Sequence, residues 1–289
     1  MIIGIHANLN KPSVRDILCP LLEWMAEQRI DVLISQPLAD LLSLSHCRAR
    51  IVSPDEFVQQ SDIVLALGGD GTMLAAAREI GAYETPLLGV NLGGLGFLAE
   101  IAVENLYANL EQLIDGQYQI QERMVLASQV CKPKDATQYH ALNDIVLNRQ
   151  GNSRVLKFDV SIDGVYFCTY NADGLIVSTP TGSTAYSLSV GGPIVVPAVD
   201  TLILSPICPH TLTARPTVIS ATSHVQIDVL SEDADAFLSM DGQVNVPIVP
   251  GCQVEIKRAD YHVKLVTFYD HNYFELLRKK LQWGALPRK

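Results

Sequence analysis

The sequence predicts an α/β domain with a doubly wound parallel sheet, then a β-rich, sandwich-like domain, and a final helix that returns to the first domain. Three observations carry this prediction. Short apolar strands alternate with helices over the first hundred residues, alternating strand patterns dominate beyond about Glu122, and an amphipathic helix ends the chain. We place the domains at residues 1–110 with 270–289 and at residues 111–269.

The first domain has the alternation of strand and helix that is typical of a parallel sheet. Its expected helices are Ser13–Gln28, with Ser13 and Asp16 at capping-box spacing, and Met73–Ile80. Its expected strands are Ile2–Ile5, Asp31–Ile34, Asp62–Leu67 and Pro86–Asn91. Ligands of such sheets bind beyond the carboxyl ends of the strands.

The second domain is expected to contain antiparallel strands. Val155–Ile162 alternates polar and apolar residues, Asp163-Gly164 supplies a hairpin turn, and Val165–Thr169 is the returning strand. Similar runs are found at Val225–Leu230, Gln253–Lys257 and His262–Phe268.

The last helix is expected to have one apolar face. Phe274, Leu277 and Leu281 share this face, and Glu275 and Lys279 form an i,i+4 pair. Because such a face needs a partner, we expect the helix to pack on the first domain.

The composition excludes several classes of protein. Apolar residues make up 48% of the chain and charged residues 18%, which excludes a disordered protein. The net charge of −10 disfavours nucleic acid or an anionic membrane as partner. Six scattered cysteines without a Cys-x-x-Cys pair, and a start without a signal sequence, favour a reducing cytoplasm. The uncharged stretch 174–199 is rich in hydroxyl groups and does not read as a membrane span.

Gly68-Gly69-Asp70-Gly71-Thr72 is the most informative motif. It lies between an apolar strand and a helix, where free backbone N–H groups can approach an anion. Such a triplet is also an ordinary turn sequence, and it matches neither the Walker loop nor the dinucleotide fingerprint. Within this strand–helix context, Asp70 is placed to act on a hydroxyl or to hold a metal beside a phosphate, which indicates a phosphotransferase.

Two further groups of polar residues suit a nucleotide ligand. Asn143 and Asp144 precede an apolar strand, where an amide and a carboxylate could hold two ribose hydroxyls, or could simply form a turn. The stretch from Asp173 to Ser187 has many hydroxyls and small residues that suit the wall of a polar site. In it, Tyr186 offers a face to a nicotinamide or adenine ring, unless it is a core tyrosine.

Three basic residues, Arg154, Arg78 and Lys157, are candidate phosphate partners. None of the seven histidines has metal-ligand spacing, and Asp241-Gly242-Gln243 can be a plain hairpin turn.

With these motifs in this order, nearly the whole chain resembles the NAD kinase family, bacterial type. The glycine–aspartate loop is shared with 6-phosphofructokinases and with lipid kinases, whereas Thr179–Ser187 is more specific. The resemblance implies transfer of a phosphoryl group from ATP to the 2′-hydroxyl of the adenosine ribose of NAD, which gives NADP. It also implies an α/β domain, a β-sandwich-like domain and a C-terminal helix that crosses back.

The same resemblance implies the site residues. Asp70 is the catalytic base, and Asn143 and Asp144 contact ribose hydroxyls. The residues implied in ligand binding are Asp70, Gly71, Asn143, Asp144, Arg154, Asn171, Asp173, Thr184, Ala185, Tyr186, Ser187, Leu188, Ser189 and Gln243. A divalent cation, Mg²⁺, is expected with ATP, and its protein ligands stay open. Family likeness further suggests a homo-oligomer, a dimer or a tetramer.

Two positions depart from the family pattern. The family commonly has glutamate where this chain has Asp144, and Asn171 is neutral where the residue bears on nicotinamide redox state and donor choice. Preference between NAD and NADH, and between ATP and polyphosphate, therefore stays open. The rival functions are a lipid kinase, disfavoured by the hydroxyl-rich wall, and a module that senses NAD without turnover, which could dispense with Asp70.

Overall fold

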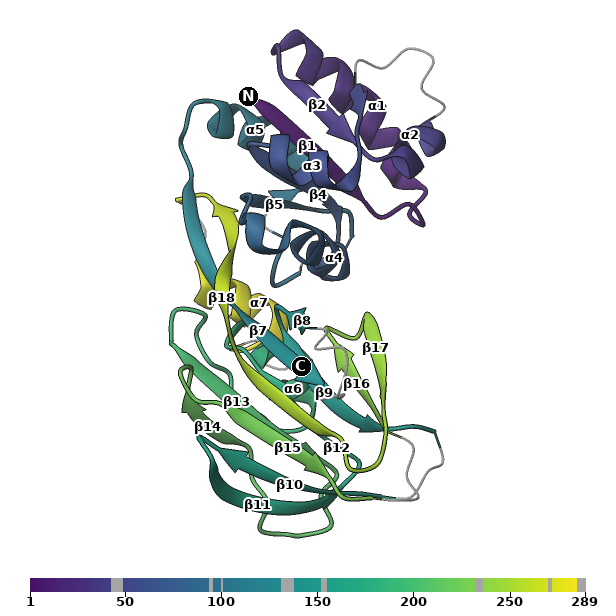
Figure 1. Cartoon of the computed structure of the whole chain (residues 1–289). Coiled ribbons are helices and arrows are strands. Elements are labelled where there is room, and N and C mark those ends of the chain that lie inside the picture. Colours follow the sequence, from purple (N-terminus) through teal and green to yellow (C-terminus); the bar gives the residue numbers. More distant parts are fainter. Residues whose placement is uncertain are drawn as a thin grey trace. The chain divides into compact units, whose positions relative to one another are not determined.

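The chain forms two compact units in a computed structural model that describes residues 1–42, 49–93, 96–99, 101–130, 138–151, 155–231, 236–269 and 272–284 (Figure 1). The first unit comprises Met1–Glu122 with Val263–Lys289, and the second comprises Arg123–His262. Two long strands, β7 (Gln119–Val130) and β18 (Gln253–Thr267), each contribute residues to both units. The unit limits therefore fall inside these strands.

The first unit is built on a parallel sheet with the strand order β18-β5-β4-β1-β2-β3, and β6 also pairs with β5. The strands are β1 (Ile2–Ala7), β2 (Asp31–Ile34), β3 (Ala49–Ile51), β4 (Ile63–Gly68), β5 (Leu87–Asn91) and β6 (Ile101–Ala102). Chain order reverses between β1 and β4, so the sheet is doubly wound, as predicted. In such sheets this reversal point is where ligands bind.

Helices cover both faces of this sheet (Figure 1). On one face, α1 (Ser13–Glu27), α2 (Gln36–Leu42) and α5 (Leu106–Ile114) share a core with the strands. On the other face lie α3 (Pro54–Gln60) and α4 (Asp70–Ile80). The close approach there needs glycine, because a Cβ on Gly4 would touch Phe57 and a Cβ on Gly89 would touch Met73. Two short 3-10 turns, η1 (Gly81–Tyr83) and η2 (Val103–Asn105), complete the unit.

The predicted capping box at Ser13 and Asp16 is wrong. Helix α1 begins after Pro12 without a side-chain cap. A capping box does occur at α3, where the Ser53 hydroxyl accepts from the Glu56 N–H and the Glu56 carboxylate accepts from the Ser53 N–H. The spacing of a serine and an acidic residue alone does not show which pair forms a capping box, because the box also requires the right backbone conformation at the start of the helix.

The C-terminal helix α7 (Tyr273–Leu281) belongs to the first unit, as predicted. The Lys280 ammonium lies 5.4 Å from the centre of the Phe97 ring, and Lys279 pairs with Glu275 at 3.0 Å. The predicted apolar face is wrong in part. Leu276 and Leu277 are buried, whereas the Phe274 side chain is 54% exposed.

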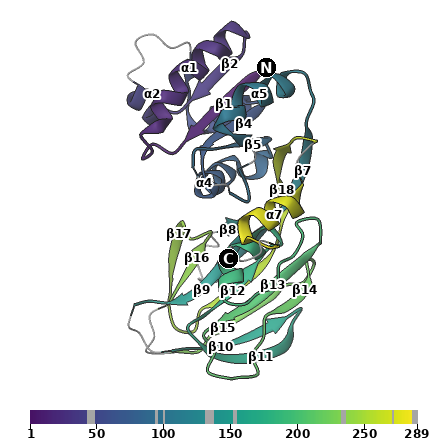
Figure 2. The ribbon, with the colours of Figure 1, turned by 180° about the vertical axis from the view of Figure 1, so that it is seen from behind.

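The second unit is a sandwich of two sheets (Figure 2). The first sheet contains the second-unit parts of β7 and β18, with β8 (Gln138–Ala141), β10 (Leu156–Ile162), β11 (Val165–Ala172) and β15 (Val225–Val229). The second sheet has the antiparallel order β14-β13-β12-β9-β16-β17. Its strands are β9 (Asp144–Arg149), β12 (Gly174–Ser178), β13 (Thr201–Ile207), β14 (Thr217–Ser220), β16 (Ala236–Met240) and β17 (Val244–Ile248).

The core of the second unit lies between its two sheets. Phe158 and Ile227 come from one sheet, Ile145, Leu175 and Leu238 come from the other, and all are fully buried. Apolar side chains that alternate along both sets of strands thus meet face to face, as in other sandwiches.

The hairpin predicted at Asp163-Gly164 is confirmed. Both residues have positive φ, 52° and 75°, as a two-residue hairpin turn between β10 and β11 requires. The two strands predicted at 253–257 and 262–268 are in fact one, β18, because the polar residues between them continue the extended backbone.

Candidate active site

The glycine loop joins β4 to α4 at the reversal point of the sheet. Strand β4 is buried along its whole length, and Gly69 precedes Asp70, the first residue of α4. The N–H groups of Thr72 and Met73 both donate to the Gly69 carbonyl, at 2.9 and 3.1 Å. Asp70 thus lies at the helix N-terminus, where the helix dipole favours negative charge.

The Asp70 carboxylate is held by the segment that follows β5. It accepts hydrogen bonds from the Phe97 N–H at 2.8 Å and the Leu98 N–H at 3.0 Å. A Cβ on Gly96 would overlap the carboxylate, so Gly96 is required for this approach. Gly71, the next residue of α4, is exposed. The loop therefore presents one carboxylate in a fixed position beside an exposed glycine.

Sequence reasoning missed Lys11, which lies in the loop between β1 and α1. The Asn8 N–H donates to the Leu67 carbonyl at 3.1 Å, so this loop follows the strand next to β4. The Lys11 ammonium would lie only 3.2 Å from a Cβ built on Gly93, in the loop that follows β5. A cation therefore lies at the carboxyl ends of the strands. The position of Lys11 in a loop between a strand and a helix is the sequence signal that could have identified it. Arg78, by contrast, lies in the last turn of α4, at the end of the helix opposite to Asp70.

The second unit has a pocket of about 490 Å³ on the outer face of its six-stranded sheet. It is lined by Asn143, Asp144, Val146, Asn148, Ala185, Tyr186, Phe237, Ser239, Asp241, Gly242 and Asn245. In the register of the sheet, Phe237 pairs with Asn148 and Ser239 with Val146 and Asn245. Paired residues of adjacent strands share a face, so these side chains form one wall.

Asp241 holds the main chain of the Asn143–Asp144 pair. Its carboxylate accepts from the N–H groups of Leu142 at 2.9 Å, Asn143 at 2.7 Å and Asp144 at 3.1 Å. The Asp241 N–H donates in turn to the Asp144 carbonyl at 3.0 Å. The turn at Asp241 is therefore more than a hairpin connection, because it fixes the chain on which two predicted ligand-binding residues lie.

The Asp144 carboxyl is buried in this pocket, with 4% of its surface exposed. Its pKa is raised to about 7, mainly by burial and in addition by the nearby Asp241 carboxylate, while a hydrogen bond from the Tyr186 main chain acts in the opposite direction. Near neutral pH this carboxyl can donate as well as accept a hydrogen bond.

Most hydroxyls of the 178–189 segment point inward. The Thr179 hydroxyl donates to the Leu142 carbonyl at 2.6 Å, the Ser183 hydroxyl donates to the Pro180 carbonyl at 2.6 Å, and the Ser187 and Ser205 hydroxyls lie 3.0 Å apart. Thr179, Ser183 and Ser187 are fully buried. These hydroxyls hold the segment together, because those of Thr179 and Ser183 bond main-chain carbonyls and that of Ser187 bonds a neighbouring strand through Ser205.

The ligand-facing part of this segment is shorter than predicted from its composition. The 3-10 turn η3 (Thr181–Thr184) and the short helix α6 (Tyr186–Ser189) flank Ala185, and Ala185 and Tyr186 line the pocket. Tyr186 is 42% exposed, and burial raises its pKa. Thr184 and Leu188 are half-buried, and Ser189 is exposed.

Three other predicted residues of the second unit, Asp173, Asn171 and Gln243, do not line this pocket. Asp173 forms an ion pair with Arg149 at 2.7 Å. Asn171 is exposed on β11, and its carbonyl accepts from the His210 N–H at 2.8 Å. Gln243 is exposed in the turn after Asp241, and Arg154 lies outside the described residues. Their roles in binding stay predictions.

Sequence reasoning missed Phe237, Ser239, Asn148 and Asn245 in the pocket wall. Each lies on a strand of the six-stranded sheet, and only the register between the strands brings these four side chains together. Within the described ranges, we find no group of three or more His, Cys, Asp or Glu side chains that could hold a metal ion. Nor does any helix in the described ranges have the length and apolarity to span a membrane.

Comparison with protein families gives two matches along the chain. The model for the ATP-NAD kinase N-terminal domain matches residues 3–118, and the model for the ATP-NAD kinase C-terminal domain matches residues 142–268. Together they cover the glycine loop and the pocket described above.

Relatives and solved structures agree with these matches. The chain is 42% identical to the NAD kinase of Geotalea daltonii, with 98% of each chain covered, and 43% identical to that of Moorella thermoacetica, with 98% of this chain and 90% of the relative covered. Yeast NADH kinase in complex with NADH superposes with a TM-score of 0.91 at 26% identity, covering 100% of this chain and 89% of that one. The fold is also that of an Archaeoglobus fulgidus NAD kinase in complex with ATP, with a TM-score of 0.77 at 23% identity and coverage of 98% and 99%.

Proposed function

The chain belongs to the ATP-NAD kinase family, and on this premise we propose which of its residues perform the reaction. The enzyme transfers a phosphoryl group from ATP to the 2′-hydroxyl of the adenosine ribose of NAD, which gives NADP. The alternatives of a lipid kinase and a non-catalytic sensing module are not supported.

Asp70 is the general base in this proposal. A ribose hydroxyl is a poor nucleophile, so a carboxylate must accept its proton as the new P–O bond forms. The observation that carries this role is the fixed carboxylate at the reversal point of the sheet, bonded to the Phe97 and Leu98 N–H groups. Those two bonds keep the carboxylate oriented before any ligand arrives, which is the preorganisation that catalysis favours.

The phosphate groups of ATP bind at the same end of the sheet. The exposed Gly71 and the N-terminus of α4 offer main-chain N–H groups, and Lys11 offers a positive charge. A divalent ion such as Mg²⁺ would be held mainly by the phosphate oxygens of ATP, since no cluster of metal-holding side chains is found among the described residues. When bound, the ion neutralises charge on the migrating phosphoryl group.

The pocket of the second unit binds the dinucleotide. Asn143 and Asp144 hold ribose hydroxyls, for which the raised pKa of Asp144 is suited, because a neutral carboxyl both donates and accepts. Tyr186 and Ala185 contact a base ring, and Thr184, Leu188 and Ser189 complete the ligand surroundings. Ser187 supports them from inside, because it is fully buried and bonded to Ser205. Asp173, Asn171, Arg154 and Gln243 keep the binding roles that family likeness gives them.

We also propose a cytoplasmic homo-oligomer. The described cysteines, Cys19, Cys168, Cys208 and Cys252, are free thiols, which suits a reducing compartment. The dimeric or tetrameric state rests on family likeness, and light scattering of the purified chain tests it.

The decisive assay follows NADP production from NAD, ATP and Mg²⁺ by the purified chain. We expect continuous NADP formation that stops when a chelator removes the divalent ion and resumes when Mg²⁺ is restored. Binding of NAD without NADP formation would contradict the proposal, as would phosphorylation of diacylglycerol in place of NAD.

A further inference from the structure

The second unit contains another pocket, of about 380 Å³, that shares no lining residue with the pocket around Asp144. It is lined by Ala221, Thr222, Lys257, Arg258, Ala259, Asp260 and His262. Its volume lies in the range of small-molecule sites. Nothing in the kinase reaction assigns it a role.

The pocket opens where the pairing between β15 and β18 ends. Asp228 pairs with Gln253 at one end of this pairing and Val225 pairs with Ile256 at the other, and the pairing does not continue beyond Ile256. The next residue of β18, Lys257, is exposed, and Arg258 is half-buried. The chain before β15 turns away at Thr222, which leaves the gap that these side chains line.

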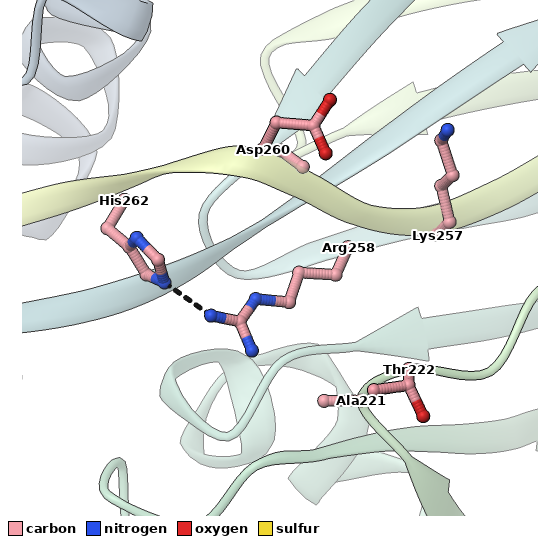
Figure 3. Close-up of a pocket in the computed structure, with 7 residues that line it drawn as sticks. Ala221, Thr222, Lys257, Arg258, Asp260 and His262 are labelled. Carbon is pink, nitrogen blue, oxygen red and sulfur yellow. Dashed lines mark hydrogen bonds between the residues drawn. The ribbon is translucent and has the colours of Figure 1, made fainter.

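Arg258 is oriented inside this gap by His262. Figure 3 shows both side chains on the same side of the β18 ribbon, with Thr222 beyond them, whereas Lys257 and Asp260 project from the other side. An Arg258 terminal nitrogen lies 2.6 Å from His262 Nε2. A guanidinium can only donate, so Nε2 is the acceptor and His262 carries its proton on Nδ1.

The remaining donors of Arg258 have little to bind. Its other terminal nitrogen lies 3.7 Å from an Asp200 carboxylate that is 78% exposed, which is longer than a hydrogen bond. Lys257 and Asp260 project from the other side of the strand, so Arg258 supplies the positive charge on the side that faces Thr222, near the exposed Asp200.

We propose that this second pocket binds a small phosphorylated molecule, with Arg258 as the anchor. The planar fork of arginine matches phosphate oxygens in a bidentate contact. The His262 contact holds the fork in place, so less side-chain entropy is lost when the anion binds.

Isothermal titration of the purified chain with inorganic pyrophosphate tests this site. We expect saturable binding that Arg258→Gln weakens by about tenfold or more, since a charge-assisted bidentate contact is lost. His262→Ala should weaken it by about two- to fivefold, because the guanidinium then loses the contact that orients it. Lys257→Met, at an exposed position whose side chain projects from the other side of β18, is the matched control and should leave binding unchanged.

Two controls separate this site from the kinase site. Arg215→Gln removes one positive charge from an exposed loop of the same unit and should leave pyrophosphate binding unchanged. Lys11→Met should weaken only binding at the glycine loop. Unchanged binding in both Arg258→Gln and His262→Ala, equal weakening in Lys257→Met and Arg258→Gln, or loss of all binding in Lys11→Met, would overturn the proposal. None of these results would bear on NADP formation.

Discussion

The N–H of Asp144 donates to the Asp241 carboxylate at 3.1 Å, and the Asp144 side chain lies close enough to that carboxylate for its own pKa to be raised by it. Asp241 thus both holds the main chain of Asp144 and disfavours ionisation of the Asp144 side chain. Burial is the larger cause of the raised pKa. Near neutral pH the pocket consequently keeps one of its two carboxyls protonated for part of the time.

The first prediction concerns stability and pH. The pKa of Asp144 is raised from 3.8 to about 7 in the folded chain, so the folded state keeps a proton that the unfolded state loses. The free energy of unfolding should therefore fall as pH rises from about 4 to about 7, and stay level above that. At 1.36 kcal/mol per pKa unit the fall is on the order of 4 kcal/mol at most.

Urea unfolding at a series of pH values checks this dependence. Asp144→Asn should remove it and make the chain more stable than wild type at pH about 8, because no buried carboxylate then has to ionise. Asp115→Asn, at an exposed position after α5, is the matched control and should keep the wild-type profile. If Asp144→Asn and wild type have the same pH profile, the raised pKa is wrong.

The second prediction concerns Gly96→Ala. The new Cβ would overlap the Asp70 carboxylate and displace it from the Phe97 and Leu98 N–H groups. We expect kcat to fall by about tenfold to a hundredfold, because the proton acceptor is misplaced. The free energy of unfolding should fall by about 1–3 kcal/mol through overpacking.

The matched variant for stability is Gly69→Ala, whose Cβ would face open space. It should unfold with nearly the wild-type free energy. A kcat for Gly96→Ala within about twofold of wild type would mean that the position of Asp70 does not limit the rate.

The third prediction concerns Lys11→Met, which keeps the length of the side chain and removes its charge. Loss of a charged hydrogen bond to phosphate costs about 1.5–3 kcal/mol, so KM for ATP should rise by about tenfold to a hundredfold. KM for NAD should change little. Lys279→Met, which breaks an exposed pair with Glu275, is the control and should leave both constants unchanged. An equal rise in KM for ATP and in KM for NAD would mean that Lys11 does not act specifically on the phosphates of ATP.

The fourth prediction separates support from contact within the 178–189 segment. The Ser183 hydroxyl donates to the Pro180 carbonyl at 2.6 Å and accepts from the Val195 N–H at 3.0 Å. Ser183→Ala should lower the free energy of unfolding by about 1–3 kcal/mol, since it removes the acceptor of the part-buried Val195 N–H and one of two donors to the Pro180 carbonyl. Its KM for NAD should stay close to wild type, whereas Tyr186→Ala should raise it. If KM for NAD rises in Ser183→Ala as much as in Tyr186→Ala, the Ser183 hydroxyl contacts the ligand and the prediction is wrong.

The parts of the site that the sequence could predict are local. The glycine loop lies between one strand and the next helix, so the place of Asp70 follows from neighbouring residues. Asn143, Asp144, Ala185 and Tyr186 were expected near one ligand, and they line one pocket.

The parts that could not be predicted depend on residues far apart in the chain. Asp241 bonds the main chain of Asn143, 98 residues away, and Phe237 enters the pocket only through the register of β16 against β9. The hydroxyls of Thr179 and Ser183 suggest a ligand wall, but they point inward because buried main-chain groups need partners.

The central claim is that Asp70 accepts the proton from the 2′-hydroxyl of NAD, and Asp70→Asn tests it most directly. The measurement is kcat for NADP formation from ATP, Mg²⁺ and NAD, with NAD binding and the free energy of unfolding determined on the same sample. We predict that kcat falls by about a hundredfold to ten-thousandfold while the Kd for NAD stays within about threefold of wild type. A folded Asp70→Asn variant that turns over at nearly the wild-type rate would contradict the account.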